Sequence, residues 1–183
     1  MTFIMKPLPP IETPRLMLRR WSDDDLNGLR ELTQRAEVMR HIGAQVTLTE
    51  EQTGQEHVAK LAHWHAHGFG ARAAVRRDTN EWIGYAVLQH PRPDVVELQP
   101  SDVEIGWLFL PFAWGQGFAT EAARALRDEG FERLGLARVV ARYQPANTAS
   151  ARIMEKIGMR FEHEAVDRHG NGIRIYCMES TAS

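Results

Sequence analysis

Apolar and charged positions in the N-terminal half of the chain follow two different periods. Between residues 11 and 21 they alternate at every second residue, which predicts a strand. Ser22 and the three aspartates after it predict a helix start, because serine caps the first turn and acids favour the positive end of the helix dipole. A second capping box at 49–52 predicts a helix to about His67. Residues 71–76 and 82–88 have the pattern of a hairpin.

The C-terminal half has the same mixture of elements. Its expected strands cover residues 103–110, 138–143, 161–166 and 173–179, and its expected helices begin at about Gly117 and at Asn147. Asn147 is a typical capping residue, and Gly158 is expected to end the second of these helices. Strands that follow one another directly, mixed with strands separated by helices, predict an α/β (α+β) fold with antiparallel stretches.

Composition places the chain in a broad class without indicating an activity. At 183 residues one domain is expected, over residues 11–180, with residues 1–10 as an N-terminal extension. The 22 Lys and Arg nearly balance 24 Asp and Glu, which argues against nucleic-acid and anionic-membrane partners. No apolar run has the length of a membrane span, and Cys177 has no partner for a disulfide, so a cytoplasmic location is expected. The composition is compatible with a monomer or a homodimer.

The most informative segment is the glycine turn at residues 114–121, WGQGFATE, between an apolar strand and an amphipathic helix. Glycines at this place let backbone N–H groups turn toward a phosphate, whose charge the helix dipole also favours. The chain lacks the phosphate-loop pattern of NTPases, and the turn lacks the third glycine of a dinucleotide-binding motif. A tight turn that uses its glycines for geometry alone is the alternative.

Three ordered motifs give this turn a context: residues 104–110 (EIGWLFL), the glycine turn itself and residues 147–159. Together they resemble the GNAT superfamily of acyl-CoA-dependent N-acetyltransferases, over nearly the whole chain. The opening segment 13–19, TPRLMLR, is similar to that of the branch containing bacterial ribosomal-protein N-terminal acetyltransferases. Two positions depart from the family pattern. Trp114 stands where the family has Gln or Arg, and Met154 stands where many members have a tyrosine.

The resemblance implies a fold, a co-substrate and a reaction. The implied fold is a central, mixed, mostly antiparallel twisted sheet of about seven strands flanked by about four helices. Acetyl-CoA is the implied co-substrate, with no metal, and the acceptor is an amine, either a protein N-terminus or a small molecule. A sensor domain that binds acyl-CoA without turnover is the alternative, which Met154 favours. The residues implied to contact the cofactor are Leu108, Phe109, Leu110, Gly115, Gln116, Gly117, Phe118, Ala119, Thr120, Asn147 and Ser150.

In the implied reaction the amine attacks the thioester directly, and each step needs a group. Backbone groups of residues 108–110 are expected to pair with the pantetheine arm like an added strand. Glu104 is the candidate base, because burial in an apolar strand makes a carboxylate more basic; a solvated strand face or a salt bridge is the alternative. Ser150 is the candidate proton donor to the thiolate, with helix capping as the alternative, and Tyr143 is a weaker substitute.

The acceptor site is the least defined part of the sequence. Acids between residues 94 and 104 give one stretch a negative charge that suits an amine, although solvated loop acids are the commoner explanation. His63 and His67 lie four residues apart, but no further ligand at zinc spacing accompanies them, so a solvated helix face is favoured. The candidate wall residues of the acceptor pocket are Trp21, His41, Tyr85 and Trp107.

Overall fold

One mixed sheet organises the described part of the chain, which comprises residues 8–92, 95 and 97–180 of the computed structural model. Its strand order is β1-β2-β3-β4-β5-β6-β8-β7. Neighbouring strands are antiparallel except β5 and β6, which are parallel. The strands are β1 (Ile11–Glu12), β2 (Leu16–Arg20), β3 (Ala71–Arg76), β4 (Trp82–Gln89), β5 (Glu104–Phe109), β6 (Arg138–Tyr143), β7 (Arg160–Val166) and β8 (Gly172–Glu179).

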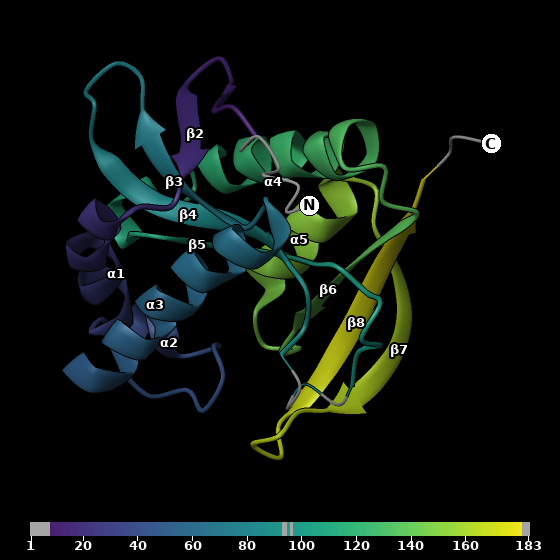
Figure 1. Ribbon diagram of the computed structural model, residues 1–183. Helices are drawn as coiled ribbons and strands as arrows, with labels where there is room; N and C mark the ends of the chain where they lie inside the picture. The colour runs from purple at the N-terminus through teal and green to yellow at the C-terminus, as the bar shows by residue number, and fades with distance from the viewer. Residues whose placement is uncertain (1–7, 93–94, 96, 181–183) are drawn as a thin grey trace.

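Helices cover both faces of the sheet (Figure 1). One face carries α1 (Leu26–Thr33), α2 (Ala36–Met39) and α3 (Glu50–His67), and the other carries α4 (Phe118–Asp128) and α5 (Thr148–Lys156). The larger apolar core lies between the sheet and α4, where Ala122, Ala123 and Leu126 are fully buried. A smaller core under α1 and α3 contains Trp21, Leu29 and Trp64. None of the helices within the described residues has the length and apolar character needed to cross a membrane.

The sequence predicted most of these elements, and the mixed, mostly antiparallel fold is confirmed. The expected strand at 11–21 is instead a short hairpin of β1 and β2, because the backbone turns at Thr13, whose amide donates to the carbonyl of Leu16. The sheet therefore has eight strands rather than about seven. The four-residue helix α2 was not predicted. Most of the expected N-terminal extension, residues 1–7, lies outside the described residues.

The centre of the sheet opens where β5 and β6 separate. These two parallel strands share one register pair, Glu104 with Val140, whereas β5 pairs with β4 over its full length. Beyond Glu104 the β6-facing edge of β5 therefore has no strand partner within the described residues. A parallel pair that splays in this way leaves backbone N–H and C=O groups available to an extended ligand.

Candidate functional site

The glycine turn ends at the start of α4 and leaves backbone donors exposed there. Gly115 and Gly117 have φ of +74° and +82°, a left-handed conformation that glycine adopts without strain. Gly117 is the N-cap, and no described side chain caps this helix. The first intrahelical bond runs from the amide of Glu121 to the carbonyl of Gly117, so the amides of residues 118–120 have no intrahelical acceptor. Such a helix start binds anions.

Arg15 holds the glycine turn against the β1–β2 hairpin. Its Nη1 donates to the carbonyl of Gln116 at 2.8 Å, and its Nε donates to Glu121 Oε2 at 2.7 Å. Burial raises the pKa of Glu121, but hydrogen bonds from Thr13 and Arg15 outweigh it and bring that pKa below its ordinary value. The sequence did not reveal this contact, because Arg15 and Gln116 are 101 positions apart.

The two side chains on either side of Gly115 also fix the turn. Trp114 Nε1 donates to the carbonyl of Phe109 at 2.8 Å, and Gln116 Nε2 donates to the carbonyl of Phe112 at 2.6 Å. Trp114 therefore anchors the turn to the end of β5 while its ring remains 44% exposed. The loss of the family's Gln or Arg at this position leaves the backbone of the turn in place.

The backbone of β5 alternates between its two neighbours. The amide of Leu110 donates to the carbonyl of Ile83 beside β4, and the carbonyl of Val103 accepts from the amide of Val140 in β6. Continued along the strand, this alternation turns the backbone groups of Trp107 and Phe109 toward the open edge, where the carbonyl of Phe109 accepts from Trp114 Nε1 and its amide is left for a ligand. The amide and carbonyl of Leu110 are both already bonded, the latter to Ala113. By the same alternation the backbone groups of Leu108, which pairs with Tyr85, face β4. The predicted pairing of a cofactor arm with the backbone of Leu108 and Leu110 therefore does not fit this arrangement.

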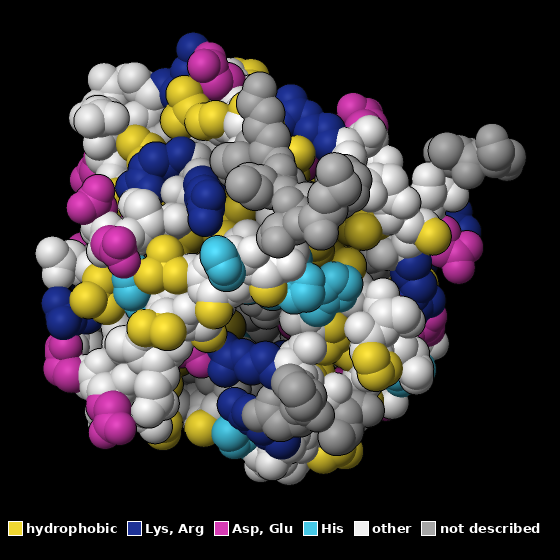
Figure 2. All heavy atoms as spheres, viewed as in Figure 1, with side chains coloured by type: hydrophobic (Ala, Val, Ile, Leu, Met, Phe, Trp, Pro, Cys, Tyr) yellow, Lys and Arg dark blue, Asp and Glu magenta, His cyan; other side chains and the backbone are white. Residues whose placement is uncertain are grey.

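A cavity of about 500 Å³ lies on the α1–α3 side of the sheet, next to the splayed strands. Figure 2 shows this face with a hollow near its centre and Lys and Arg side chains along its lower border. Five parts of the chain supply the walls: α1 with the loop after α2, α3, the β4–β5 pair with the loop between them, β6, and the β7–β8 turn. Of the residues predicted for the site, Glu104, Leu108, His41 and Tyr85 line this cavity.

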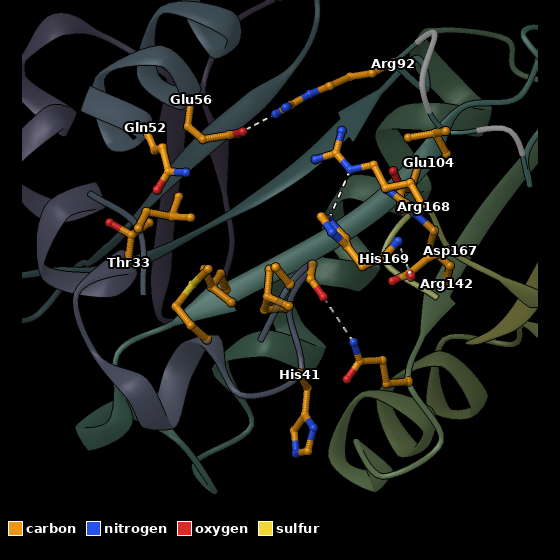
Figure 3. A pocket seen from close by; sticks show the side chains of 18 of the residues that line it. Thr33, His41, Gln52, Glu56, Arg92, Glu104, Arg142, Asp167, Arg168 and His169 are labelled. Atoms are coloured by element: carbon orange, nitrogen blue, oxygen red, sulfur yellow. Dashed lines mark hydrogen bonds and ion pairs between the residues drawn. The ribbon is translucent and has the colours of Figure 1, made fainter. Parts of the chain in front are cut away.

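The structure does not bring the two tryptophans of the predicted acceptor wall to this cavity. Trp21 is buried behind Tyr85, with its ring centroid 5.4 Å from that of Tyr85, and its Nε1 donates to His57 Nδ1 at 3.1 Å. Trp107 packs in the core beneath α4 because successive side chains of β5 point to opposite faces. His41 is at the rim, with its ring directed away from the other labelled side chains (Figure 3).

Glu104 lies in the cavity wall and is 9% exposed. Its Oε1 accepts from Arg142 Nε at 2.7 Å, and Gln89 Nε2 lies 3.5 Å from its Oε2. Arg142 also donates to Glu97. Burial lowers the pKa of Arg142, but the two carboxylates outweigh it and raise that pKa above its ordinary value. Glu104 therefore combines two of the arrangements considered from sequence, a buried acid facing a cavity and a salt bridge (Figure 3).

The acidic stretch before β5 is largely compensated by arginines of β6. Asp102 Oδ1 lies 3.2 Å from Arg138 Nε, while Glu97 and Glu104 share Arg142. Asp94 lies outside the described residues. Most of the negative charge expected from sequence is therefore paired with arginines. What remains among the described residues is at Arg142, where two carboxylates share one guanidinium.

The start of α5 matches its predicted cap. Asn147 Oδ1 accepts from the amide of Ser150 at 3.2 Å. Neither residue is among the described residues that line the cavity, whereas Tyr143, at the end of β6, does line it. Met154 is 3% exposed and belongs to the core. The two candidates for the proton donor that carry a hydroxyl group are therefore Tyr143, at the end of β6, and Ser150, in the first turn of α5.

The histidines of α3 form a cluster with His90. The ring centroids of His63 and His67 are 4.5 Å apart, and those of His67 and His90 are 4.8 Å apart. His63 Nδ1 lies 2.9 Å from the carbonyl of Phe69, and His63 Nε2 accepts from the amide of His90. Across the described residues there is no group of three or more His, Cys, Asp or Glu side chains placed to hold a metal ion.

Comparison with known proteins identifies the family and the fold class of this chain. The acetyltransferase (GNAT) domain matches residues 15–160, and the chain therefore belongs to the GNAT acetyltransferase family. It is 35% identical over 152 residues to the uncharacterized N-acetyltransferase YnaD of Bacillus subtilis, covering 83% of each chain. An acetyltransferase structure from Agrobacterium tumefaciens is 28% identical with a TM-score of 0.81, covering 98% of this chain and 99% of that one.

The ribosomal-protein branch is represented among the solved structures without being confirmed for this chain. RimL, a ribosomal L7/L12 alpha-N-protein acetyltransferase in complex with coenzyme A, has a TM-score of 0.74 and covers 95% of this chain and 99% of that one. Its identity of 17% shows the fold alone. Membership of the family supports acetyl transfer from acetyl-CoA to an amine.

Proposed function

We propose that the protein transfers an acetyl group from acetyl-CoA to a primary amine bound in the cavity, by direct attack of the amine on the thioester. One observation carries the proposal. The uncapped start of α4 and the open edge of β5 lie on one continuous segment, and the same strand presents Glu104 to the cavity. The start of α4 thus provides a site for the pyrophosphate, the open edge of β5 a site for the pantetheine arm, and Glu104 a carboxylate for the amine. These three follow one another as the parts of acetyl-CoA and the amine do.

The cofactor half of the proposed site uses backbone groups. The amides of Phe118, Ala119 and Thr120 receive the pyrophosphate, with Gly115, Gln116 and Gly117 forming the turn around it. The pantetheine arm adds to the open edge of β5 through Trp107 and Phe109, with the side chain of Leu108 facing the cavity. The amide of Phe109 is the candidate donor to the thioester oxygen, a role typically contributing roughly 3 kcal/mol in the transition state.

The acceptor half supplies the proton transfers. Glu104 removes a proton from the ammonium group, through water, and Arg142 orients its carboxylate. The neutral amine attacks the thioester carbon, the attacking nitrogen releases its extra proton to water, and the C–S bond breaks as the tetrahedral intermediate collapses to the amide and the thiolate. Ser150 or Tyr143 protonates the departing thiolate, in place of the tyrosine that Met154 replaces. Asn147 holds the start of α5, next to the arm.

Thiol release from acetyl-CoA tests this function against a sensor domain, which Met154 favours. The protein is mixed with acetyl-CoA and a panel of primary amines that includes peptide N-termini, polyamines, aminoglycosides and amino acids. We expect thiol release that depends on at least one amine, with the acetylated amine confirmed by mass spectrometry. Tight CoA binding without amine-dependent thiol release across the panel would identify a binding domain instead.

A further inference from the structure

The cavity contains a buried ammonium group, that of Lys60 on α3. Lys60 is 8% exposed and lines the cavity. Its Nζ lies 4.8 Å from the ring centroid of Tyr85, and the nearest described carboxylate oxygen, Glu56 Oε2, is 3.7 Å away. That distance exceeds an ordinary hydrogen bond, whereas an ammonium group has three hydrogen atoms to donate. A buried cation in this setting is suited to an anionic ligand group.

The charges around Lys60 do not cancel locally. Glu56 is the carboxylate of this wall, and Arg92 donates to it at hydrogen-bond distance. Lys60 and Arg92 therefore share one carboxylate, which leaves a surplus positive charge beside α3. Figure 3 shows Glu56 and Arg92 reaching toward each other across the cavity.

The wall around Glu104 has the opposite surplus. Arg142 is shared by Glu97 and Glu104. Glu97 Oε2 is buried and has no hydrogen-bond partner within the described residues. Two carboxylates with one guanidinium leave a surplus negative charge, next to the carboxylate that we propose as the base. Asp167 and Arg168, from the β7–β8 turn, also line the cavity and add one charge of each sign. Lys60 with Arg92 and Glu97 with Glu104 therefore form the positive and negative ends of a dipole across the cavity.

The two ends of this dipole lie along one face of β4 and β5. Lys60 sits over Tyr85, and Glu104 pairs with Gln89, four residues further along β4. At about 3.3 Å per residue, these strand positions are roughly 13 Å apart. A cavity of about 500 Å³ with this spacing has the size of a small molecule rather than a polymer.

We infer that the acceptor is a small amino carboxylic acid, whose carboxylate is bound by Lys60 while its amino group points toward Glu104. This inference rests on the proposed function, since it names the class of amine that the acetyl group reaches. A polyamine or an aminoglycoside would place a second cation against Lys60 and Arg92, which is unfavourable in a buried site. Lys60 is thus a specificity-determining residue, and it takes no part in the proton transfers.

Matched acceptors test the inference. Each amino acid is compared with its carboxamide and with the amine lacking the carboxylate, by acetyl-CoA-dependent thiol release. We expect kcat/KM to favour the carboxylate form by on the order of 10- to 100-fold, because a hydrogen bond to a charged group is at stake. Equal or better use of the carboxamides or of the polyamines overturns the inference while leaving acetyl transfer intact. Absence of thiol release with every amine would instead count against the proposed function.

Variants of Lys60 assign the preference to this side chain. Lys60→Gln is expected to lower kcat/KM for the carboxylate form much more than for the carboxamide, so that the preference is lost, and Lys60→Arg is expected to retain the preference. Thermal unfolding shows whether each variant folds. A purely structural lysine would instead lower kcat/KM for both acceptors equally, and an unchanged ratio in Lys60→Gln overturns the assignment.

A binding measurement decides the question independently of turnover. Amino acids and their carboxamides are titrated into CoA-saturated protein by calorimetry. We expect the carboxylate forms to bind more tightly, and Lys60→Gln to abolish the difference. Failure of every amino acid to bind, or equal binding of acid and carboxamide, overturns the inference.

Discussion

The two halves of the candidate site are built from different groups. The half at the start of α4 consists of backbone amides within one continuous segment, from the open edge of β5 to residue 120. The acceptor cavity consists of side chains from five parts of the chain, joined by ion pairs such as that between Glu104 and Arg142. A backbone site tolerates changes of side chain as long as the turn keeps its shape. A side-chain site depends on each charged partner.

This difference has a consequence for specificity. Backbone amides at a helix start recognise a phosphate group whatever the neighbouring side chains are. The cavity, in contrast, has a charge pattern set by Lys60, Glu56, Glu97 and Glu104, so a single substitution changes which amine fits. Variants of the two halves should therefore separate cofactor binding from acceptor turnover.

Glu104→Gln is expected to have the largest effect on turnover. Loss of the base should lower kcat by roughly 100- to 1,000-fold, the usual contribution of general base catalysis, while affinity for CoA stays unchanged. Steady-state kinetics and calorimetry with CoA measure the two quantities. Glu162→Gln is the matched control, because Glu162 also pairs with an arginine of β6, Arg138, and does not line the cavity. Equal kcat in Glu104→Gln and wild type would remove Glu104 from the mechanism.

Gly117→Leu should act on the other half. Gly117 has φ +82°, and a side chain there strains the turn and contacts Arg15, whose Nη2 lies 3.4 Å from the position of a Cβ. We expect affinity for CoA to fall on the order of 100-fold through loss of charge-assisted hydrogen bonds. Gly135→Leu is the control, since Gly135 has φ +64° with open space around it. If both variants bind CoA equally, the glycine turn is not the phosphate site.

The proton donor to the thiolate is expected to have a smaller effect. Tyr143→Phe and Ser150→Ala each remove one hydroxyl, and the variant that removes the donor should lower the single-turnover rate about tenfold, because water replaces part of the contribution. Rapid-quench measurements with the best acceptor compare the two variants. If both single variants and the double variant keep the wild-type single-turnover rate, the proton that the thiolate receives comes from solvent.

The weakest predicted effect lies outside both halves, in the cluster of His63, His67 and His90. Burial lowers the pKa of His63 and His67 in the folded protein, and the neighbouring histidines add to this effect. At His63 the hydrogen bond to the carbonyl of Phe69 opposes burial without outweighing it. The unfolded chain therefore binds protons more readily, so the free energy of unfolding should be constant above about pH 7 and fall below the ordinary histidine pKa of about 6.5.

Chemical denaturation between pH 8 and 5 measures this loss. His67→Asn should flatten the pH profile, while His65→Asn, on the same helix but outside the ring contacts of the cluster, serves as the control. An unfolding free energy that rises toward pH 5 would contradict the predicted direction.

The features that the sequence predicted correctly are those set by residues close together in the chain. The periods of strands and helices, the caps at Thr49 and Asn147 and the glycine turn are local features, and the structure has them. The contacts that shape the acceptor cavity are not local. Arg142 lies 38 positions from Glu104, and no period in the sequence indicates that they meet.

The misplaced wall residues have a related cause. Trp21 and Trp107 are aromatic residues near the expected site, but the direction of a side chain depends on the face of the sheet that it occupies. Trp107 is on a strand whose neighbouring residue, Leu108, lines the cavity, and the alternation sends the tryptophan to the other face. The strand that contains Trp107 was predicted correctly, but that prediction did not say which face of the sheet the tryptophan ring occupies.

A crystal structure with CoA tests the account most directly. We predict that the pyrophosphate accepts hydrogen bonds from the amides of residues 118–120, that the pantetheine arm pairs with Trp107 and Phe109 along the open edge of β5, and that the thiol points into the cavity beside Glu104. Pyrophosphate bound away from the start of α4, or an arm that does not enter the gap between β5 and β6, would contradict the account.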